Sequence, residues 1–297
     1  MNVAERRAFS RALSGIMRAT VDEVLAHQTR IPAAGQAADR IGITGPPGAG
    51  KSTLIGHLIR NRLATMGPTA RLAVIAIDPT SPISHGSILG DRIRMDTDQD
   101  DPRVFIRSLP SSTAQDGLSD NISDILGLID TFGFSETILE TVGVGQAEHA
   151  IRLLVDTMVL IVPPEAGDAV QAIKAGIIEL PDIYVVNKAD LPGAGRALAE
   201  MRWLAGQRPR GAWQPPILAT SDRQPDSWAA LGAAIDSHRG WLRENSDAGA
   251  IHAARLHYQV TSLVLRRIKE TAGARPLPAS LAQGYADCIR RLAHELK

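Results

Sequence analysis

The sequence predicts an α/β protein with a mainly parallel sheet flanked by helices and with helical extensions at both ends. Seven short apolar runs predict the strands, and most are continuous rather than alternating, which is typical of strands buried on both faces. The runs cover residues 40–44, 72–77, 104–107, 137–139, 158–162, 183–186 and 217–219. Helical stretches separate several of them, as in right-handed strand-helix-strand units. Because such sheets bind ligands at the carboxyl ends of their strands, we expect the chemistry in the loops that follow these runs.

We expect three parts along the chain: an N-terminal helical extension (1–35), a main domain that contains the sheet (36–245) and a C-terminal helical region (246–297). The apolar residues of the first part fall at helical spacing and predict an amphipathic helix docked on the body: Phe9, Leu13, Ile16, Met17 and Val24. Two further helices are predicted at 251–270 and 280–295, separated by the stretch TAGARPLPA. They could pack on the sheet or on a second copy of the chain.

The composition argues against several classes of protein. Lys plus Arg and Asp plus Glu both number 32, so no net charge draws the chain toward nucleic acid or an acidic membrane surface. The single cysteine, Cys288, excludes an intramolecular disulfide framework and fits a reducing compartment. No apolar run approaches the length that spans a bilayer, and the N-terminus lacks the apolar region of a secretory signal. We therefore expect a cytoplasmic protein that binds neither nucleic acid nor membranes.

A glycine-rich segment directly after the first predicted strand indicates a phosphate site. It fits G-x-x-x-x-G-K-[ST] and is followed by Thr53 and a helical stretch, which is the context that the motif requires. The segment is Gly45, Pro46, Pro47, Gly48, Ala49, Gly50, Lys51 and Ser52. Successive backbone N–H groups of such a loop point at phosphate oxygens, and the helix N-terminus adds a partial positive charge. We expect Lys51 to bridge the terminal phosphates of a nucleotide and the Ser52 hydroxyl to ligate Mg²⁺.

A second motif selects the base. Asn187, Lys188, Ala189 and Asp190 follow the predicted strand IYVV, and N-K-x-D at that place is typical of guanine recognition. The carboxylate of Asp190 can accept the ring N1–H and the exocyclic amine of guanine, whereas adenine presents a lone pair at N1. Asn187 and Lys188 would orient the loop and pack beside the base. The pattern therefore favours GTP over ATP.

Several acidic residues at the ends of strands are candidates for the metal shell and for hydrolysis. Glu140 closes a strand and is followed three residues later by Gly143, which has the form of a D-x-x-G segment with Glu in place of Asp. We expect Glu140 to face Mg²⁺ or to position water, and the Gly143 amide to sense the γ-phosphate. Asp78 and Asp91 could complete the metal shell, directly or through water. Gln146 and His149 lie close enough in sequence to touch the attacking water, although for His149 we favour a plain helical position.

Together these pieces resemble the MeaB/ArgK/methylmalonic aciduria type A family, the G-protein chaperones of adenosylcobalamin-dependent mutases. The resemblance rests on GPPGAGKST, AIDPTSP, GSILGDRIRM, ETVGVGQAE, AGDAVQAIKAGIIEL and VVNKADL. It implies that Asp78, Asp91 and Glu140 are the acids associated with Mg²⁺ and that Gln171 and Lys174 lie on a loop that responds to nucleotide and partner. It also implies a homodimer formed through the C-terminal helices. The family gates cofactor loading and protects its mutase, and we expect GTP hydrolysis to be slow until the partner orders the catalytic loops.

Three positions depart from the family pattern. A glycine-rich stretch of the relatives is replaced here by residues 113–118 (TAQDGL), and Glu165 stands where a loop glycine is usual. The later base-contacting loop, usually Ser-Ala and an apolar residue, is Ser221, Asp222 and Arg223. Ser221 keeps the first position, and two charged side chains follow it. We expect partner contacts to differ accordingly.

The sequence leaves three other functions to be weighed. A nickel-delivery GTPase of a related class would need a Cys/His cluster for its metal, which one cysteine and eight scattered histidines do not offer. A protein kinase, a role once attached to the ArgK name, would need a protein acceptor and a catalytic base that the sequence does not identify. An ATPase would be distinguished from a GTPase by its nucleotide preference after Asp190→Ala.

Overall fold

A computed structural model describes residues 1–28, 37–78, 101–110, 118, 121–141, 147–165, 181–209, 211–273 and 280–295. Within these residues seven strands form one sheet in the order β3-β2-β4-β1-β5-β6-β7, and every neighbouring pair is parallel. The strands are β1 (Asp39–Thr44), β2 (Leu72–Asp78), β3 (Val104–Pro110), β4 (Glu136–Glu140), β5 (Thr157–Val162), β6 (Ile183–Val186) and β7 (Ile217–Ala219). The predicted parallel α/β fold is confirmed, and each predicted run is a strand.

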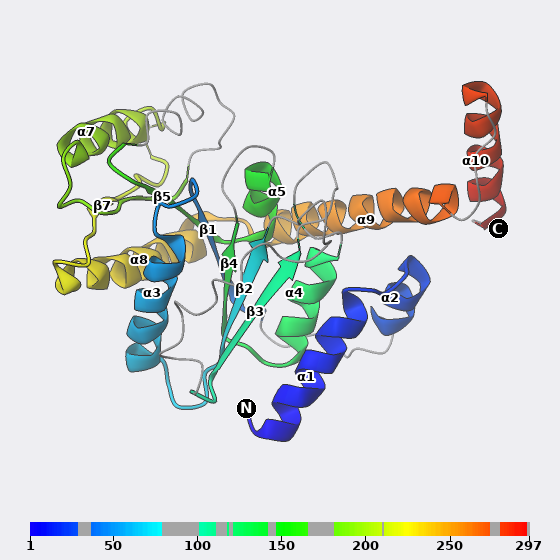
Figure 1. Ribbon diagram of the computed structural model, residues 1–297, viewed down its shortest axis with the longest axis horizontal. Helices are drawn as coiled ribbons and strands as arrows, with labels where there is room; N and C mark the ends of the chain where they lie inside the picture. Colours follow the sequence, from blue (N-terminus) through cyan, green and yellow to red (C-terminus); the bar gives the residue numbers. More distant parts are fainter. Residues whose placement is uncertain are drawn as a thin grey trace.

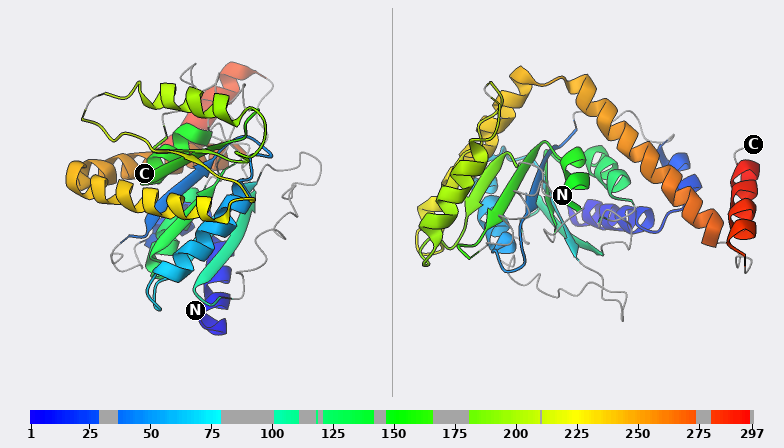
Figure 2. Two further views of the ribbon diagram at one scale, coloured as in Figure 1. Left: turned by 90° about the vertical axis from the view of Figure 1, so that its left-hand side faces the viewer. Right: turned by 90° about the horizontal axis from the view of Figure 1, so that it is seen from above.

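Helices cover both faces of the sheet (Figures 1 and 2). Their bounds are α1 (Val3–Ile16), α2 (Val21–Gln28), α3 (Lys51–Thr65), α4 (Ile122–Thr131), α5 (Ala147–Leu154), α7 (Ala194–Ala205), α8 (Ala229–Asn245), α9 (Ala248–Gly273) and α10 (Leu281–Glu295). The right-hand view of Figure 2 shows α3 and α8 on one side of the sheet and α1, α4 and α5 on the other. Alternate residues of β2 enter the two resulting cores, Leu72 and Val74 on the α3 side and Ala73, Ile75 and Ile77 on the α1 side. This double burial explains the continuous apolar runs.

The N-terminal segment is amphipathic as predicted, but it forms two helices rather than one. Phe9, Leu13 and Ile16 of α1 are buried in the core beside the sheet. The chain then turns and α2 begins, where Thr20 and Glu23 exchange hydrogen bonds between side chain and backbone. This is a capping box, which starts a new helix and so ends the continuity that the apolar spacing suggested.

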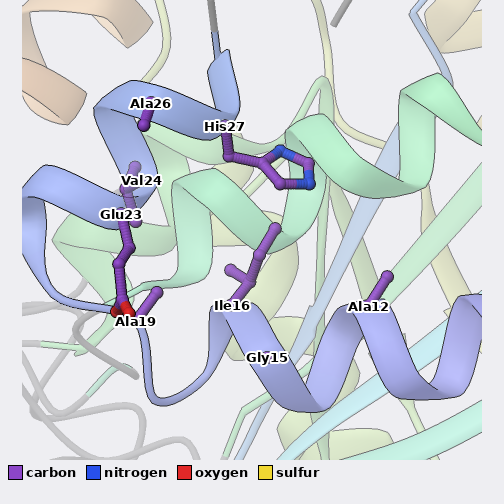
Figure 3. Close-up of a pocket in the computed structure, with 8 residues that line it drawn as sticks. All are labelled: Ala12, Gly15, Ile16, Ala19, Glu23, Val24, Ala26 and His27. Carbon is purple, nitrogen blue, oxygen red and sulfur yellow. The ribbon is translucent and has the colours of Figure 1, made fainter. Parts of the chain in front are cut away.

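A hollow of about 420 Å³ lies between α1 and α2 (Figure 3). Its lining consists mainly of small and apolar side chains, with one carboxylate and one imidazole: Ala12, Gly15, Ile16, Ala19, Glu23, Val24, Ala26 and His27. The small residues of α1 therefore leave space beside α2 instead of packing tightly against it.

Both predicted C-terminal helices are present. The long helix α9 leaves the body and carries α10 at its far end (Figure 1). Arginines fix α9 to the rest of the protein: Arg255 pairs with Asp156 at 2.7 Å, and the buried Arg266 contacts Asn121 and Asp124 of the α4 start. Among the described helices, none is long and apolar enough to cross a membrane.

Candidate nucleotide-binding site

The loop between β1 and α3 is shaped by glycines that approach neighbouring backbone and side-chain atoms closely. Gly45 has φ +151°, and a Cβ there would lie 2.1 Å from the Ile161 carbonyl oxygen of β5. Gly50 has φ +93°, and a Cβ there would lie 2.2 Å from Nδ2 of Asn187. Glycine is required at both positions because any side chain would push the loop away from the ends of β5 and β6. The predicted phosphate loop thus lies directly over the centre of the sheet.

Lys51, the first residue of α3, points back into this loop. Its ammonium group donates to the carbonyl oxygens of Gly45 at 2.8 Å and Pro46 at 3.2 Å. Burial lowers the pKa of Lys51, and the nearby Glu140 carboxylate opposes that effect. A cation placed at the mouth of a loop of backbone N–H groups is suited to binding phosphate oxygens.

Ser52 and Glu140 are brought together from opposite sides of the loop. The Ser52 hydroxyl donates to a carboxylate oxygen of Glu140 at 3.3 Å. Glu140 is placed by the pairing of β4 with β1, which continues in the hydrogen bond from Thr141 N to Ile43 O. A hydroxyl and a carboxylate are hard oxygen donors, the type that Mg²⁺ prefers, so this pair fits the predicted metal.

The other predicted residues near the phosphates are only partly defined. Asp78 is the last residue of β2, which pairs with β4. Asp91, Gly143, Gln146, Gln171 and Lys174 lie outside the described residues, as does the stretch 113–117. The backbone of His149 belongs to α5. Within the described part of the chain, no three His, Cys, Asp or Glu side chains are grouped to hold a metal ion.

The guanine-type motif is joined to the phosphate loop by hydrogen bonds. Asn187 is 4% exposed, and its amide donates to Ala49 O at 2.8 Å while accepting a hydrogen bond from the Thr220 hydroxyl at 3.1 Å. Lys188 adopts φ +55° and donates from its ammonium group to Gly48 O at 2.9 Å. Asn187 and Lys188 therefore position the loop after β6 against the loop after β1.

The carboxylate of Asp190 contacts the next loop of the same edge. Its Oδ1 accepts a hydrogen bond from Ser221 Oγ at 2.6 Å, and its Oδ2 lies 3.2 Å from Nε of Arg223. The Ser221 hydrogen bond is the main cause of a lowered pKa for Asp190, and the positive charge of Arg223 adds to it. The stretch 221–223, assigned to the base from sequence, thus lies beside the predicted base-reading carboxylate.

Sequence reasoning missed three residues that support this loop. Thr220 orients Asn187, and His57 of α3 reaches Asp222, with Nε2 and Oδ1 separated by 3.5 Å. The His57 ring stacks on Trp228, with centroids 4.4 Å apart and an interplanar angle of 6°. Thr220 could have been suspected because it directly precedes Ser221. The His57 contact joins residues far apart in the chain and left no local signal.

Comparison with known proteins identifies the family. Residues 17–276 match the family described as methylmalonyl Co-A mutase-associated GTPase MeaB. A protein of Pyrococcus horikoshii named as a GTPase is 38% identical over 253 residues, which is 84% of this chain and 77% of that protein. The mouse methylmalonic aciduria type A homolog, named as mitochondrial, is 39% identical over 191 residues, 62% of this chain and 45% of its own length. A crystal structure described as a LAO/AO transport system kinase superposes with a TM-score of 0.57 at 25% identity, covering 91% of this chain and 85% of the other. The chain therefore belongs to the MeaB family of methylmalonyl Co-A mutase-associated GTPases.

Proposed function

We propose that the site holds a guanine nucleotide with Mg²⁺ and that residues 45–53 bind its phosphates. The observation that carries this assignment is that Lys51, Ser52 and Glu140 lie close together at the carboxyl ends of the central strands β1 and β4. The Ser52 and Glu140 oxygens are 3.3 Å apart. Backbone N–H groups of the loop and the Lys51 ammonium group neutralise phosphate charge. Ser52 and Glu140, with Asp78 and Asp91, would ligate the metal, and the Gly143 amide would contact the γ-phosphate. Bound there, Mg²⁺ would offset the negative charge that develops on the phosphates during hydrolysis.

The same proposal assigns the base to the loops after β6 and β7. Asp190 accepts the two N–H groups of the guanine edge, and Ser221 fixes the orientation of that carboxylate. Asn187 and Lys188 are positioning residues, because their side chains are engaged by the phosphate loop. The Asp190→Ala variant should therefore lose its preference for GTP over ATP, which competition binding with both nucleotides measures.

We further propose that GTP turnover serves an adenosylcobalamin-dependent acyl-CoA mutase, for which the chain gates cofactor loading and protects the loaded enzyme. The family description, which names a methylmalonyl Co-A mutase, supports this partner. We expect the cytoplasm as the compartment, and the single cysteine of the chain, Cys288, fits reducing conditions there. Hydrolysis is slow in the isolated protein and faster with the partner.

The test is the steady-state rate of GTP hydrolysis by the purified protein, alone and with methylmalonyl-CoA mutase carrying adenosylcobalamin. A rise in rate that saturates with mutase concentration supports the proposal, and Glu140→Gln should lower both rates when Mg²⁺ is held at the concentration that half-saturates the wild type. Fast hydrolysis by the protein alone, unchanged by the mutase, would contradict the chaperone role. If Glu140→Gln loses activity but the wild-type rate does not respond to the mutase, the assignment of the GTPase site stands and only the proposed partner is refuted.

The C-terminal helices support a dimer. On α9 a row of large apolar side chains is about half exposed: Leu256, Val260, Val264 and Leu265. On α10 Leu281, Tyr285 and Ile289 are also exposed. Apolar side chains repeated at helical spacing are stabilised by burial against a second apolar surface. Sedimentation of the wild type and of Val260→Glu tests this, since a charge in the interface should shift a dimer toward the monomer.

A further inference from the structure

Both carboxylate oxygens of Asp190 are engaged, from two different sides. Ser221 is 2% exposed and donates to Oδ1 from the protein interior. The side chain of Arg223 is 78% exposed and reaches Oδ2 from the solvent side, with Nε at 3.2 Å. The carboxylate that is assigned to read guanine is therefore already paired with a cation of the same chain, on the side that faces solvent.

Guanine needs that same side of the carboxylate. Its N1–H and exocyclic amine must donate to both oxygens of Asp190, and the interior approach to Oδ1 is taken by Ser221. The base must then enter from the direction in which Arg223 lies. We propose that Arg223 is a specificity-determining residue that competes with the guanine edge for Asp190, so that it weakens nucleotide binding and speeds release. This inference rests on the proposed role of Asp190.

The backbone around Arg223 is fixed, so only its side chain needs to move. The backbone N–H of Arg223 donates to Ser221 Oγ at 3.1 Å, and Gln224 N donates to Ser221 O at 3.0 Å. The adjacent Asp222 is paired with His57, which stacks on Trp228. An exposed guanidinium on a fixed turn can leave Asp190 when the base arrives and return when the base departs.

The size of the effect follows from the exposure of the pair. Exposed ion pairs contribute roughly 0.2–1 kcal/mol, which corresponds to a factor of about 1.4 to 5 in affinity. Because GDP and GTP share the same base, the factor should be equal for both. It should be absent for ATP, whose adenine does not donate to Asp190 as guanine does. It should also shrink as salt is added, since screening weakens exposed charge pairs.

The experiment compares the dissociation constants and release rates of fluorescent GDP and GTP analogues for the wild type, Arg223→Ala and Arg196→Ala. Arg196 is the matched control, because its side chain is 86% exposed and its Nε lies 3.1 Å from Oε1 of Glu200, one turn further along the same helix α7. We expect Arg223→Ala to bind both analogues about 1.4- to 5-fold more tightly and to release them more slowly, while Arg196→Ala matches the wild type. Weaker binding by Arg223→Ala would make Arg223 a ligand of the nucleotide, and unchanged binding would make the ion pair incidental; either result overturns the proposal.

A second background separates this inference from the function on which it rests. In Asp190→Asn the amide keeps one acceptor and gains a donor, which suits the carbonyl at position 2 of xanthine, and it can no longer pair ionically with Arg223. In this variant the affinity for GDP should fall and the affinity for xanthosine diphosphate (XDP) should rise. Adding Arg223→Ala to Asp190→Asn should leave the affinity for XDP nearly unchanged. If Asp190→Asn leaves GDP affinity unchanged, the assignment of the base site fails. If the nucleotide preference switches but Arg223→Ala strengthens XDP binding as much as GDP binding, only the competition fails.

Discussion

Truncating Asn187 to alanine should destabilise the protein and weaken nucleotide binding together, because one buried amide joins the two halves of the site. Its Nδ2 donates to Ala49 O in the phosphate loop, and its Oδ1 accepts from Thr220 beside the base loop. Ala49 and Thr220 are themselves fully buried. After truncation both polar groups lose their partner in the protein interior.

The magnitude follows from these contacts. Truncation leaves two buried polar groups without a partner, and each costs about 1–3 kcal/mol. The free energy of unfolding should therefore fall by about 2–6 kcal/mol. At roughly 2–4 °C per kcal/mol for large domains, the melting temperature should drop by about 4–24 °C. The melting shift that GDP produces should also be smaller, since a loosened loop reduces the affinity of the folded state.

The assay is thermal unfolding of Asn187→Ala with and without GDP, with Asn245→Ala as control. The Asn245 amide also donates to a backbone carbonyl, that of Trp241 at 2.9 Å, but on an exposed helix end. Its truncation should change stability by less than about 0.5 kcal/mol. If Asn187→Ala melts with the control and keeps the full GDP shift, the amide does not couple the loops and the reasoning is wrong.

Three further predictions test the metal site, the N-terminal core and a buried imidazole. Glu140→Gln should raise the Mg²⁺ concentration for half-maximal GTP hydrolysis by about ten- to a hundredfold, measured by metal titration. Phe9→Ala should cost about 3–5 kcal/mol in urea unfolding, because its ring packs 4.6 Å from that of Phe105, while the exposed Arg11→Ala should be near neutral. Burial lowers the pKa of His238, so below about pH 6.5 the unfolded chain binds a proton that the folded protein does not. The free energy of unfolding should thus fall from pH 7.5 to 5.5, and less steeply in His238→Gln.

The strands could be predicted from sequence because strands that are buried on both faces have uninterrupted apolar sequences. In β2 every side chain from Leu72 to Ile77 is buried, and all of them except that of Ala76 enter one core or the other, so the run is apolar without interruption. The extent of β3 was less evident, since its later residues Arg107 and Ser108 are polar. Arg107 donates to Ser10 O of α1. This contact between residues distant in sequence gives a polar side chain of the edge strand β3 a hydrogen-bond partner.

The break between α1 and α2 has a local sequence signal, but the apolar spacing alone does not predict it. Thr20 and Glu23 stand in the spacing of a capping box, and the structure shows both of its hydrogen bonds. Apolar spacing dominated the prediction, because Val24 continues the helical pattern of Phe9, Leu13 and Ile16. Since Val24 is indeed buried, the pattern identified the right face while concealing the turn.

The motifs of the site could be predicted one by one, but the contacts between them could not. A phosphate loop has a local sequence signature, because its glycines and lysine act within a few residues of one another. The contact of Asn187 with Ala49 spans 138 residues, and that of His57 with Asp222 depends on how α3 lies beside the base loop. Such contacts follow from the strand order β1-β5-β6-β7, which no local pattern encodes.

That strand order also makes the two halves of the site mechanically unequal. On the base side, Asn187 and Lys188 hydrogen-bond to the phosphate loop, and Gly45 and Gly50 permit its close approach to β5 and to Asn187. On the metal side, a hydrogen bond of 3.3 Å joins Ser52 to Glu140 across the gap between α3 and β4. A weak contact is exchanged for metal ligation at little cost, whereas the buried amide of Asn187 cannot be given up cheaply. On the proposed assignment, guanine recognition is therefore built into the folded domain, while the Glu140 side can rearrange as the phosphates change. It follows that Asn187→Ala should affect GDP binding with or without metal, and Glu140→Gln should act through the metal alone.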